Sequence, residues 1–240
     1  ELYRTKHHKK GDVSLFLGCI SNTFDTDTLR ASVFVLNRLG YDVHIPKAQT
    51  CCGGLARQQG NSSLAKDYIT KNDAAFSKAN PVITVASGCG AGLHDYADLT
   101  VKDISAFLMQ CDWQDIILQP LADEVALHEP CTLRNVQKSH ADVLALLKKI
   151  PSAKVYNLTG NAQCCGGAGA YMLTQAAMAD ALLKDKLSAI DKTKAVLLAT
   201  SNIGCALHIA AGLRAQNKSL KVVHPVTIIA TQLGYTGSID

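Results

Sequence analysis

The sequence Cys-Cys-Gly-Gly occurs twice in this chain, at residues 51–54 and 164–167. Adjacent cysteines seldom form a disulfide with each other, because a disulfide prefers Cα atoms roughly 5.5–6 Å apart, whereas neighbouring Cα atoms are about 3.8 Å apart. The paired glycines lack a Cβ, so the backbone can turn sharply there and bring peptide N–H groups close to the sulfurs. The motif therefore predicts sulfurs that bind something other than each other.

Each of these motifs is part of a larger cysteine repeat. The first set comprises Cys19, Cys51, Cys52 and Cys89, and the second set comprises Cys131, Cys164, Cys165 and Cys205. In both sets a single cysteine, an adjacent pair and another single cysteine follow at nearly equal intervals. Of the nine cysteines only Cys111 lies outside the repeat, and we expect it to pack beside Trp113 as a small hydrophobic residue. The chain is therefore predicted to contain two copies of one unit.

Composition narrows the classes of function. With 240 residues, of which 48% are hydrophobic, the chain can bury a large core without a disulfide framework. The cysteine pattern thus favours metal binding or redox chemistry in a reducing, cytoplasmic setting. The net charge of +4 comes without clustered basic and aromatic residues, so we expect no nucleic-acid binding. The most apolar run, residues 195–212, contains polar residues and is predicted to be a buried strand and a helix, not a membrane span.

Strands and helices alternate along both halves. Apolar runs predict strands over 12–19, 41–46, 81–89, 124–131, 153–158 and 194–205, and helical periodicity predicts helices over 28–40, 55–71, 141–150 and 170–187. This order predicts an α/β fold made of two tandem similar units with mostly parallel sheets, related by a pseudo-two-fold repeat. We place the first unit at residues 1–120 and the second at residues 121–240.

The predicted strands bring each cysteine set together. Ligands of open α/β sheets bind outside the carboxyl ends of the strands, and the single cysteines come at such ends. Four thiolates suit a 4Fe-4S cluster or a structural zinc ion, although zinc cysteines are usually close in sequence. We therefore expect metal at the first set, the second set, or both. The alternative is that these cysteines are merely buried.

One histidine is a further candidate ligand of the second set. His208 is the third residue after Cys205, and the corresponding residue after Cys89 is Gly92. The imidazole of His208 either binds the metal of the second set or is a helix-start side chain bonded to the backbone. Mixed sulfur and nitrogen ligation suits zinc, so the alternative to a redox protein is a zinc-stabilised binding module.

The doubled motif resembles a known family. The repeat, with the stretches VASGCGAGLHDY, HEPCTLRNVQK, AQCCGGAGAY and ATSNIGCALH, is similar to the cysteine-rich CCG domains of heterodisulfide reductase, and most of all to the iron-sulfur subunit of glycolate oxidase. In heterodisulfide reductase a fifth cysteine completes a cluster that cleaves disulfides. Here Gly92 and His208 occupy that position, which argues against a thiol-disulfide reductase.

The resemblance implies an electron-transfer role. It implies a non-catalytic redox subunit of a flavin-dependent 2-hydroxy acid oxidase or dehydrogenase, acting on glycolate or lactate. One or two 4Fe-4S clusters, held by the two cysteine sets, would pass electrons from FAD on a partner subunit towards a quinone or another acceptor. It further implies a ferredoxin-like domain or chain, for which this sequence contains no CxxCxxC motif. Either Glu1 follows a cut in a longer protein or a partner supplies that domain, and partners would hold the protein at the inner face of the membrane.

Overall fold

The first sheet is built from the N-terminal half of the chain. The computed structural model describes residues 1–94, 96 and 98–237. The strand order of this sheet is β1-β3-β2-β4-β5, and its bounds are β1 Leu2–Tyr3, β2 Gly11–Phe16, β3 Tyr41–His44, β4 Val82–Thr84 and β5 Val101–Asp103. All neighbouring strands are parallel except β1, which pairs antiparallel with β3. Residues 13–16 of β2 are all buried, as expected for a parallel sheet covered on both faces.

The second sheet repeats this arrangement. Its order is β7-β6-β8-β9, with the bounds β6 Glu124–His128, β7 Lys154–Asn157, β8 Leu197–Thr200 and β9 Lys221–Val223. All three pairings are parallel. The order matches β3-β2-β4-β5 strand for strand, so β6 corresponds to β2 and β8 to β4. The predicted α/β class with two mostly parallel sheets is confirmed.

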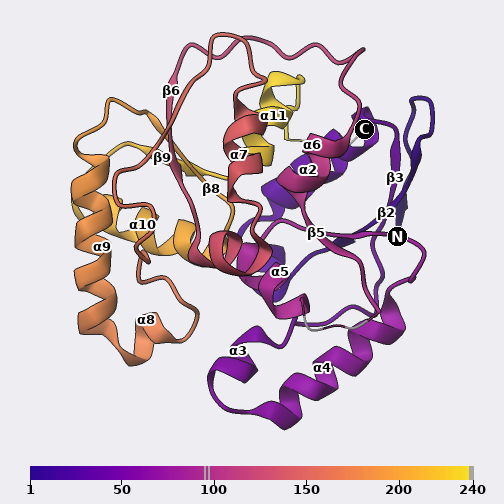
Figure 1. The fold of residues 1–240 in the computed structure, drawn as a ribbon, viewed down its shortest axis with the longest axis horizontal. Helices are drawn as coiled ribbons and strands as arrows, with labels where there is room; N and C mark the ends of the chain where they lie inside the picture. Colours follow the sequence, from indigo (N-terminus) through magenta and orange to yellow (C-terminus); the bar gives the residue numbers. More distant parts are fainter. Residues whose placement is uncertain (95, 97, 238–240) are drawn as a thin grey trace.

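Helices connect and cover the strands in both halves (Figure 1). In the first half they are α1 Cys19–Phe24, α2 Thr26–Arg38, α3 Gly54–Gln58, α4 Ser62–Ala75, α5 Ser87–Leu93 and α6 Ile104–Gln110. In the second half they are η1 Leu133–Gln137, a π-helical turn, and α7 His140–Leu147, α8 Tyr171–Thr174, α9 Ala176–Ile190, α10 Ile203–Ala215 and α11 Pro225–Gln232. The helix predicted over 55–71 is divided into α3 and α4 at Gly60, whose φ is 76°.

Four predicted strands end earlier than the sequence suggested. The strands were expected to run to the single cysteines, but β2 ends at Phe16 and β4 at Thr84. Cys19 is the first residue of α1, and Cys89 lies in the first turn of α5. The second half behaves in the same way, since β6 and β8 also end before their cysteines. Gly18, whose φ is 71°, separates β2 from Cys19, and Glu129 and Pro130 separate β6 from Cys131. Each single cysteine therefore lies in the first turn of a helix and not on the sheet.

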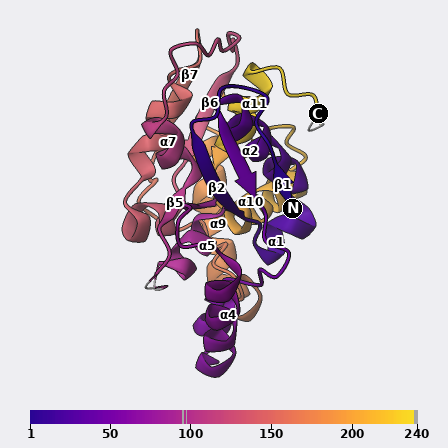
Figure 2. The same ribbon diagram turned by 90° about the vertical axis from the view of Figure 1, so that its right-hand side faces the viewer.

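The two halves pack through equivalent helices. The helix α2 packs on α11, and α6 packs on α7. Because α2 corresponds to α7 and α6 corresponds to α11, these two contacts are equivalent. Figure 1 shows these four helices together in the upper part of the molecule, while Figure 2 shows α4 extending away from the sheets at the bottom. Buried side chains of both halves, such as Leu36 of α2 and Ile229 of α11, belong to one hydrophobic cluster. The division at residues 1–120 and 121–240 therefore stays a prediction, because the core crosses it.

Among the residues that the structure describes, no helix combines the length and apolarity that crossing a bilayer requires.

Candidate metal centres

The first cysteine set lies where the strand order of its sheet reverses. From β2 the chain crosses to β3 on one side and then to β4 on the other, and such switch points are where open α/β sheets bind ligands. Cys19 follows β2 and Cys89 follows β4, while Cys51 and Cys52 lie in the turn between β3 and α3. The second set occupies the equivalent place between β6 and β8. Three segments that are distant in sequence thus bring four sulfurs to one end of each sheet.

The sulfurs of the first set contact one another. Cys19 Sγ lies 3.7 Å from Cys51 Sγ. Hydrogen bonds from the thiols of Cys19 and Cys52 lower the pKa of Cys51, so the negative charge of the set concentrates on that sulfur. The same contacts raise the pKa values of Cys19 and Cys52, and Cys52 also contacts Cys89. Without a cation, thiolates this close repel each other, and so they cannot all be ionised together.

The second set has the same pattern of contacts. Hydrogen bonds from Cys131 and Cys165 lower the pKa of Cys164, the counterpart of Cys51. A hydrogen bond from the thiol of Cys165 and, secondarily, one from Asn202 lower the pKa of Cys205. The first set therefore has one sulfur with a lowered pKa, Cys51, whereas the second has two, Cys164 and Cys205. A cation bound there would replace the thiol protons, and metal binding at such sites releases protons to solvent.

Peptide N–H groups point at several of these sulfurs. The N–H of Gly54 donates to Cys52 Sγ at 3.5 Å. In the second set the N–H groups of Gly166 and Gly167 donate to Cys164 and Cys165, both at 3.4 Å. Hydrogen bonds to cysteine sulfur stabilise the thiolate and tune the potential of a bound iron-sulfur cluster. The paired glycines thus serve the purpose expected from sequence.

The two sets adjoin at the contact between the halves. The N–H of Gly88, next to Cys89, donates to Asn202 Oδ1 at 3.0 Å. Asn202 Nδ2 in turn donates to Cys205 Sγ at 3.3 Å. Ser87 of the first half also donates its N–H to Ser201 O at 2.9 Å. A short hydrogen-bonded path therefore connects the backbone of the first set to a sulfur of the second.

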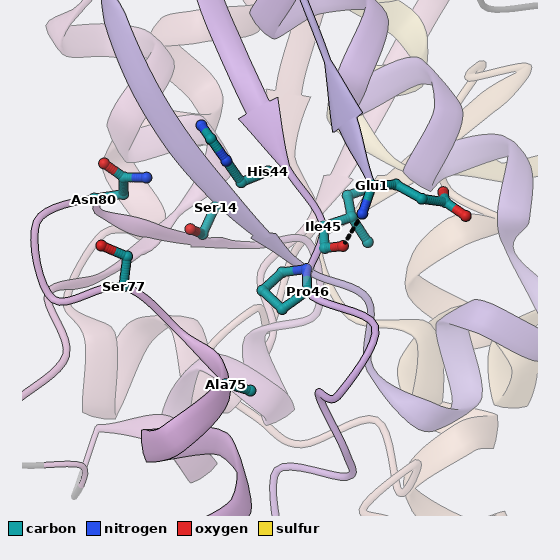
Figure 3. A pocket seen from close by; sticks show the side chains of 8 residues that line it. All are labelled: Glu1, Ser14, His44, Ile45, Pro46, Ala75, Ser77 and Asn80. Carbon is teal, nitrogen blue, oxygen red and sulfur yellow. Dashed lines mark hydrogen bonds between the residues drawn. The ribbon is translucent and has the colours of Figure 1, made fainter.

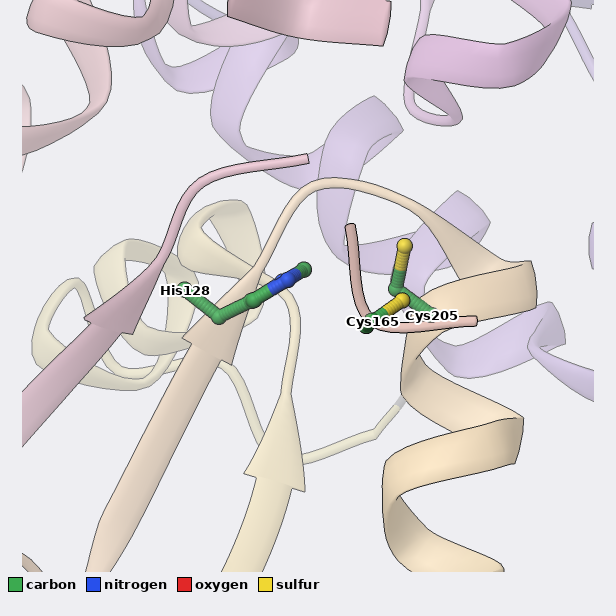
Figure 4. A group of neighbouring side chains, drawn as sticks. All are labelled: His128, Cys165 and Cys205. Atoms are coloured by element: carbon green, nitrogen blue, oxygen red, sulfur yellow. The ribbon is translucent and has the colours of Figure 1, made fainter. Parts of the chain in front are cut away.

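His128 lies beside two sulfurs of the second set. His128 at the end of β6, Cys165 and Cys205 have ligand atoms within 4.8 Å of one another, and all three are buried (Figure 4). His208 instead places Nε2 3.3 Å from Ala179 O, so its ligand role stays a prediction without a sulfur contact to support it. His128 was not among the candidate ligands identified from the sequence. Its position three residues before Cys131 was the available signal.

Gly92 and Cys111, the two other residues considered from the sequence, add no ligand to the cysteine sets. A Cβ on Gly92 would lie 3.1 Å from Cys52 Sγ, so this glycine leaves room for the sulfur. Cys111 donates its thiol to Phe107 O at 3.4 Å, and burial raises its pKa to about 11. It packs against the main hydrophobic cluster with Trp113, as expected. Cys111 is therefore a structural residue.

A surface pocket lies apart from both cysteine sets. Its volume is about 250 Å³, and it is lined by Glu1, Ser14, His44, Ile45, Pro46, Ala75, Ser77 and Asn80 (Figure 3). The terminal amino group of Glu1 donates to Ile45 O at 2.8 Å across its rim. The lining contains no cysteine, so the pocket has no part in the candidate metal centres.

A buried histidine joins the halves and predicts a pH dependence. His224 Nε2 lies 2.8 Å from Val85 O, and its Nδ1 accepts the N–H of Val226 at 3.1 Å. Burial lowers the pKa of His224 from 6.5 to about 4. Between pH 4 and pH 6.5 the histidine binds more protons in the unfolded chain than in the folded one. The free energy of unfolding therefore rises with pH across this range and levels off above pH 6.5. We expect His224→Asn to flatten that rise, measured by thermal unfolding of both proteins across the window. An unchanged pH dependence would contradict the assignment.

Comparison with known proteins gives the relatives of this chain. The CCG family, described as a cysteine-rich domain, matches residues 13–94 and 125–210. The chain is 31% identical over 95% of its length to a "Probable glycolate oxidase iron-sulfur subunit" of Bacillus subtilis, of which it covers 56%. It is 26% identical over 92% of its length to "Lactate utilization protein A 2" of Bacillus cereus, of which it covers 98%.

The similarity to solved structures is weaker. Glutamate racemase RacE1 of Bacillus anthracis aligns with a TM-score of 0.36 at 9% identity, over 95% of this chain and 81% of that one. The sequence relatives are thus the informative comparison, and both matched regions contain one complete cysteine set.

Proposed function

Because this chain belongs to the CCG cysteine-rich domain family, we propose that it is the iron-sulfur electron-transfer subunit of a flavin-dependent 2-hydroxy acid dehydrogenase. The observation that carries the proposal is the convergence of four sulfurs in each half, in two equivalent places that adjoin through Asn202. Relatives named for glycolate oxidase and for lactate utilisation support glycolate or lactate as the substrate class. The chain itself is a redox subunit and not the catalyst of substrate oxidation.

The donor set of each half fits an iron-sulfur cluster. The first and second sets each supply four thiols, the number that a 4Fe-4S cluster requires, and N–H groups that donate to sulfur. A bound cluster supplies reversible one-electron chemistry. The protein's own residues hold the ligands in register, exclude bulk water from Cys52, Cys165 and Cys205, and direct the peptide N–H groups of the paired glycines at the sulfurs.

Partners and placement complete the proposal. We place FAD and the substrate site on a partner subunit and the final acceptor, a quinone or another carrier, beyond this chain. The relative from Bacillus subtilis is longer than this chain, which covers 56% of it. A ferredoxin-like domain or chain is therefore part of the proposal. We also propose a cytoplasmic protein that reaches the inner face of the membrane through these partners alone.

One observation favours a second candidate function. His128 lies with Cys165 and Cys205 within 4.8 Å, and such mixed nitrogen and sulfur ligation suits a structural zinc ion. A zinc-stabilised binding module is the corresponding alternative. It predicts a protein with zinc in place of iron and acid-labile sulfide.

Electron transfer from the partner tests the main proposal. The protein is purified anaerobically with its flavoprotein partner, and glycolate or lactate is then added in the absence of oxygen. We expect loss of visible cluster absorbance and a new electron paramagnetic resonance signal, as after chemical reduction with dithionite. Reduction by dithionite but by neither hydroxy acid would contradict the proposed electron donor.

A further inference from the structure

A buried ammonium group lies beside the second cysteine set. Lys186 of α9 is 2% exposed, and its Nζ donates to Gly160 O at 2.6 Å. Within the described part of the chain, no carboxylate forms an ion pair with Lys186. Burying a cation without a counter-charge costs free energy, so proteins normally pair such groups. The surroundings of Lys186 should therefore contain another source of negative charge.

The sulfurs of the second set supply that charge. Burial lowers the pKa of Lys186, and the thiolates of Cys165, Cys164 and Cys205 oppose this shift. Arg134 acts in the same direction as burial, but it is paired with Glu129. A cation held among thiolates in a water-poor interior interacts with them more strongly than it would at the surface. Negative charge at the second cysteine set would therefore offset part of the cost of burying the ammonium group of Lys186, which has only Gly160 O as a hydrogen-bond acceptor in the described structure.

Among the residues that the structure describes, the first set has no equivalent buried cation. Ala65 of α4 faces Gly53 as Ala179 of α9 faces Gly166, which aligns the two helices. Asn72 then takes the place of Lys186. Asn72 is fully buried but neutral, and it accepts the N–H of Thr50 at 2.7 Å and donates to Cys51 O at 2.9 Å.

At two other matched positions the second half has a polar side chain where the first half has an apolar one. Asn202, the N-cap of α10, donates to Cys205 Sγ, whereas Ala86, the N-cap of α5, has no side-chain donor. His128 at the end of β6 corresponds to Phe16 at the end of β2. The first half does contain Arg57, which donates to Gly92 O at 3.3 Å but is partly exposed, so water screens its charge. The polar groups close to sulfur are thus concentrated on the second set.

We propose that Lys186 is the counter-charge of the second cysteine set and raises the reduction potential of the iron-sulfur centre held there. The inference rests on the proposed function and deepens it. Reduction adds one negative charge to a centre of this kind, and a nearby ammonium stabilises the more negative state. Lys186 is a tuning residue and binds no metal itself. Because the first set has Asn72 instead, the effect is specific to one centre.

The test compares Lys186 with a lysine two residues away. Lys186→Gln removes the charge and keeps a donor for Gly160 O, Lys184→Gln makes the same change at an exposed site of α9, and Lys186→Arg keeps the charge. Anaerobic redox titrations followed by electron paramagnetic resonance give the potential of each centre. We expect Lys186→Gln to lower the reduction potential of one centre by at least about 59 mV, which is a tenfold change in the equilibrium constant of a one-electron reduction. In Lys186→Gln the equilibrium constant for reduction of the other centre should stay within threefold of its value in the unmodified protein. In Lys184→Gln and Lys186→Arg the same should hold for both centres.

Each other outcome has a defined meaning. Equal potentials in Lys186→Gln, Lys184→Gln and the unmodified protein would overturn the inference, provided that iron and sulfide are present. If Lys186→Gln does not fold, Lys186→Met replaces it, and failure of both to fold would make Lys186 a structural residue and overturn the inference as well. Absence of iron and sulfide in the unmodified protein would instead contradict the proposed function, so the two failures are distinguishable.

Discussion

Cys205→Ser is expected to remove the metal of the second set and leave that of the first, with a loss of roughly half of the bound iron and sulfide when both are occupied. Cys205 is 4% exposed and receives hydrogen bonds from Cys165 and Asn202, so bulk water has little access to replace its sulfur. A serine hydroxyl is a harder and much less acidic ligand than a thiol, and soft thiolates are what iron-sulfur clusters select. The measurement is iron and acid-labile sulfide per chain after anaerobic purification.

Two matched variants complete this experiment. Cys89→Ser is the counterpart in the first set and should remove the other half of the iron. Cys111→Ser alters the cysteine outside both sets, whose thiol bonds to Phe107 O, and should leave the iron content unchanged. Equal iron content in Cys205→Ser and Cys111→Ser would show that Cys205 binds no metal.

Gly166→Ala is expected to lower the free energy of unfolding by about 2–5 kcal/mol, the sum of a left-handed backbone penalty and overpacking. Gly166 has a φ of 86°, and a Cβ there would overlap Ala179 O of α9. The backbone carbonyl cannot move aside without shifting the helix. Since Gly166 follows Cys165 and donates its N–H to Cys164 Sγ, the same strain displaces the ligands. Chemical denaturation gives the stability change, and metal content gives the effect on the site.

Gly160→Ala is the control for Gly166→Ala. Gly160 has a φ of 71°, but a Cβ there would meet no atom within 4 Å. It should therefore show only the backbone penalty of about 1–2 kcal/mol. If both variants lose similar free energy of unfolding, the contact with Ala179 does not cause the destabilisation of Gly166→Ala.

Local patterns in the sequence predicted the fold class and the family. Apolar runs located β2, β3, β4, β6, β7 and β8, because buried parallel strands have a strong and continuous signal. The short edge strands β5 and β9 gave no such signal, and neither did α6 and α11. The strands ended before the cysteines because each single cysteine already lies in the first turn of the helix that follows its strand. The CCG repeat was specific enough to identify the family.

The surroundings of the cysteine sets were beyond the reach of local patterns. Lys186 lies in an ordinary amphipathic helix, and only the packing of α9 beside the second set makes its charge unusual. Asn202 likewise becomes informative only once Gly88 of the other half is placed against it. Both contacts join segments far apart in the sequence. In the first half, Asn72 is the counterpart of Lys186 and Ala86 is the counterpart of Asn202, so the two copies of the repeat differ at both positions.

The metal content of the unmodified protein distinguishes an iron-sulfur subunit from a zinc-stabilised binding module. The chain, purified and analysed without exposure to air, is assayed for iron, acid-labile sulfide and zinc per chain. We expect iron and sulfide in equal amounts, about four of each for every occupied cysteine set, with negligible zinc. Stoichiometric zinc without sulfide would contradict it and would favour the zinc-stabilised binding module.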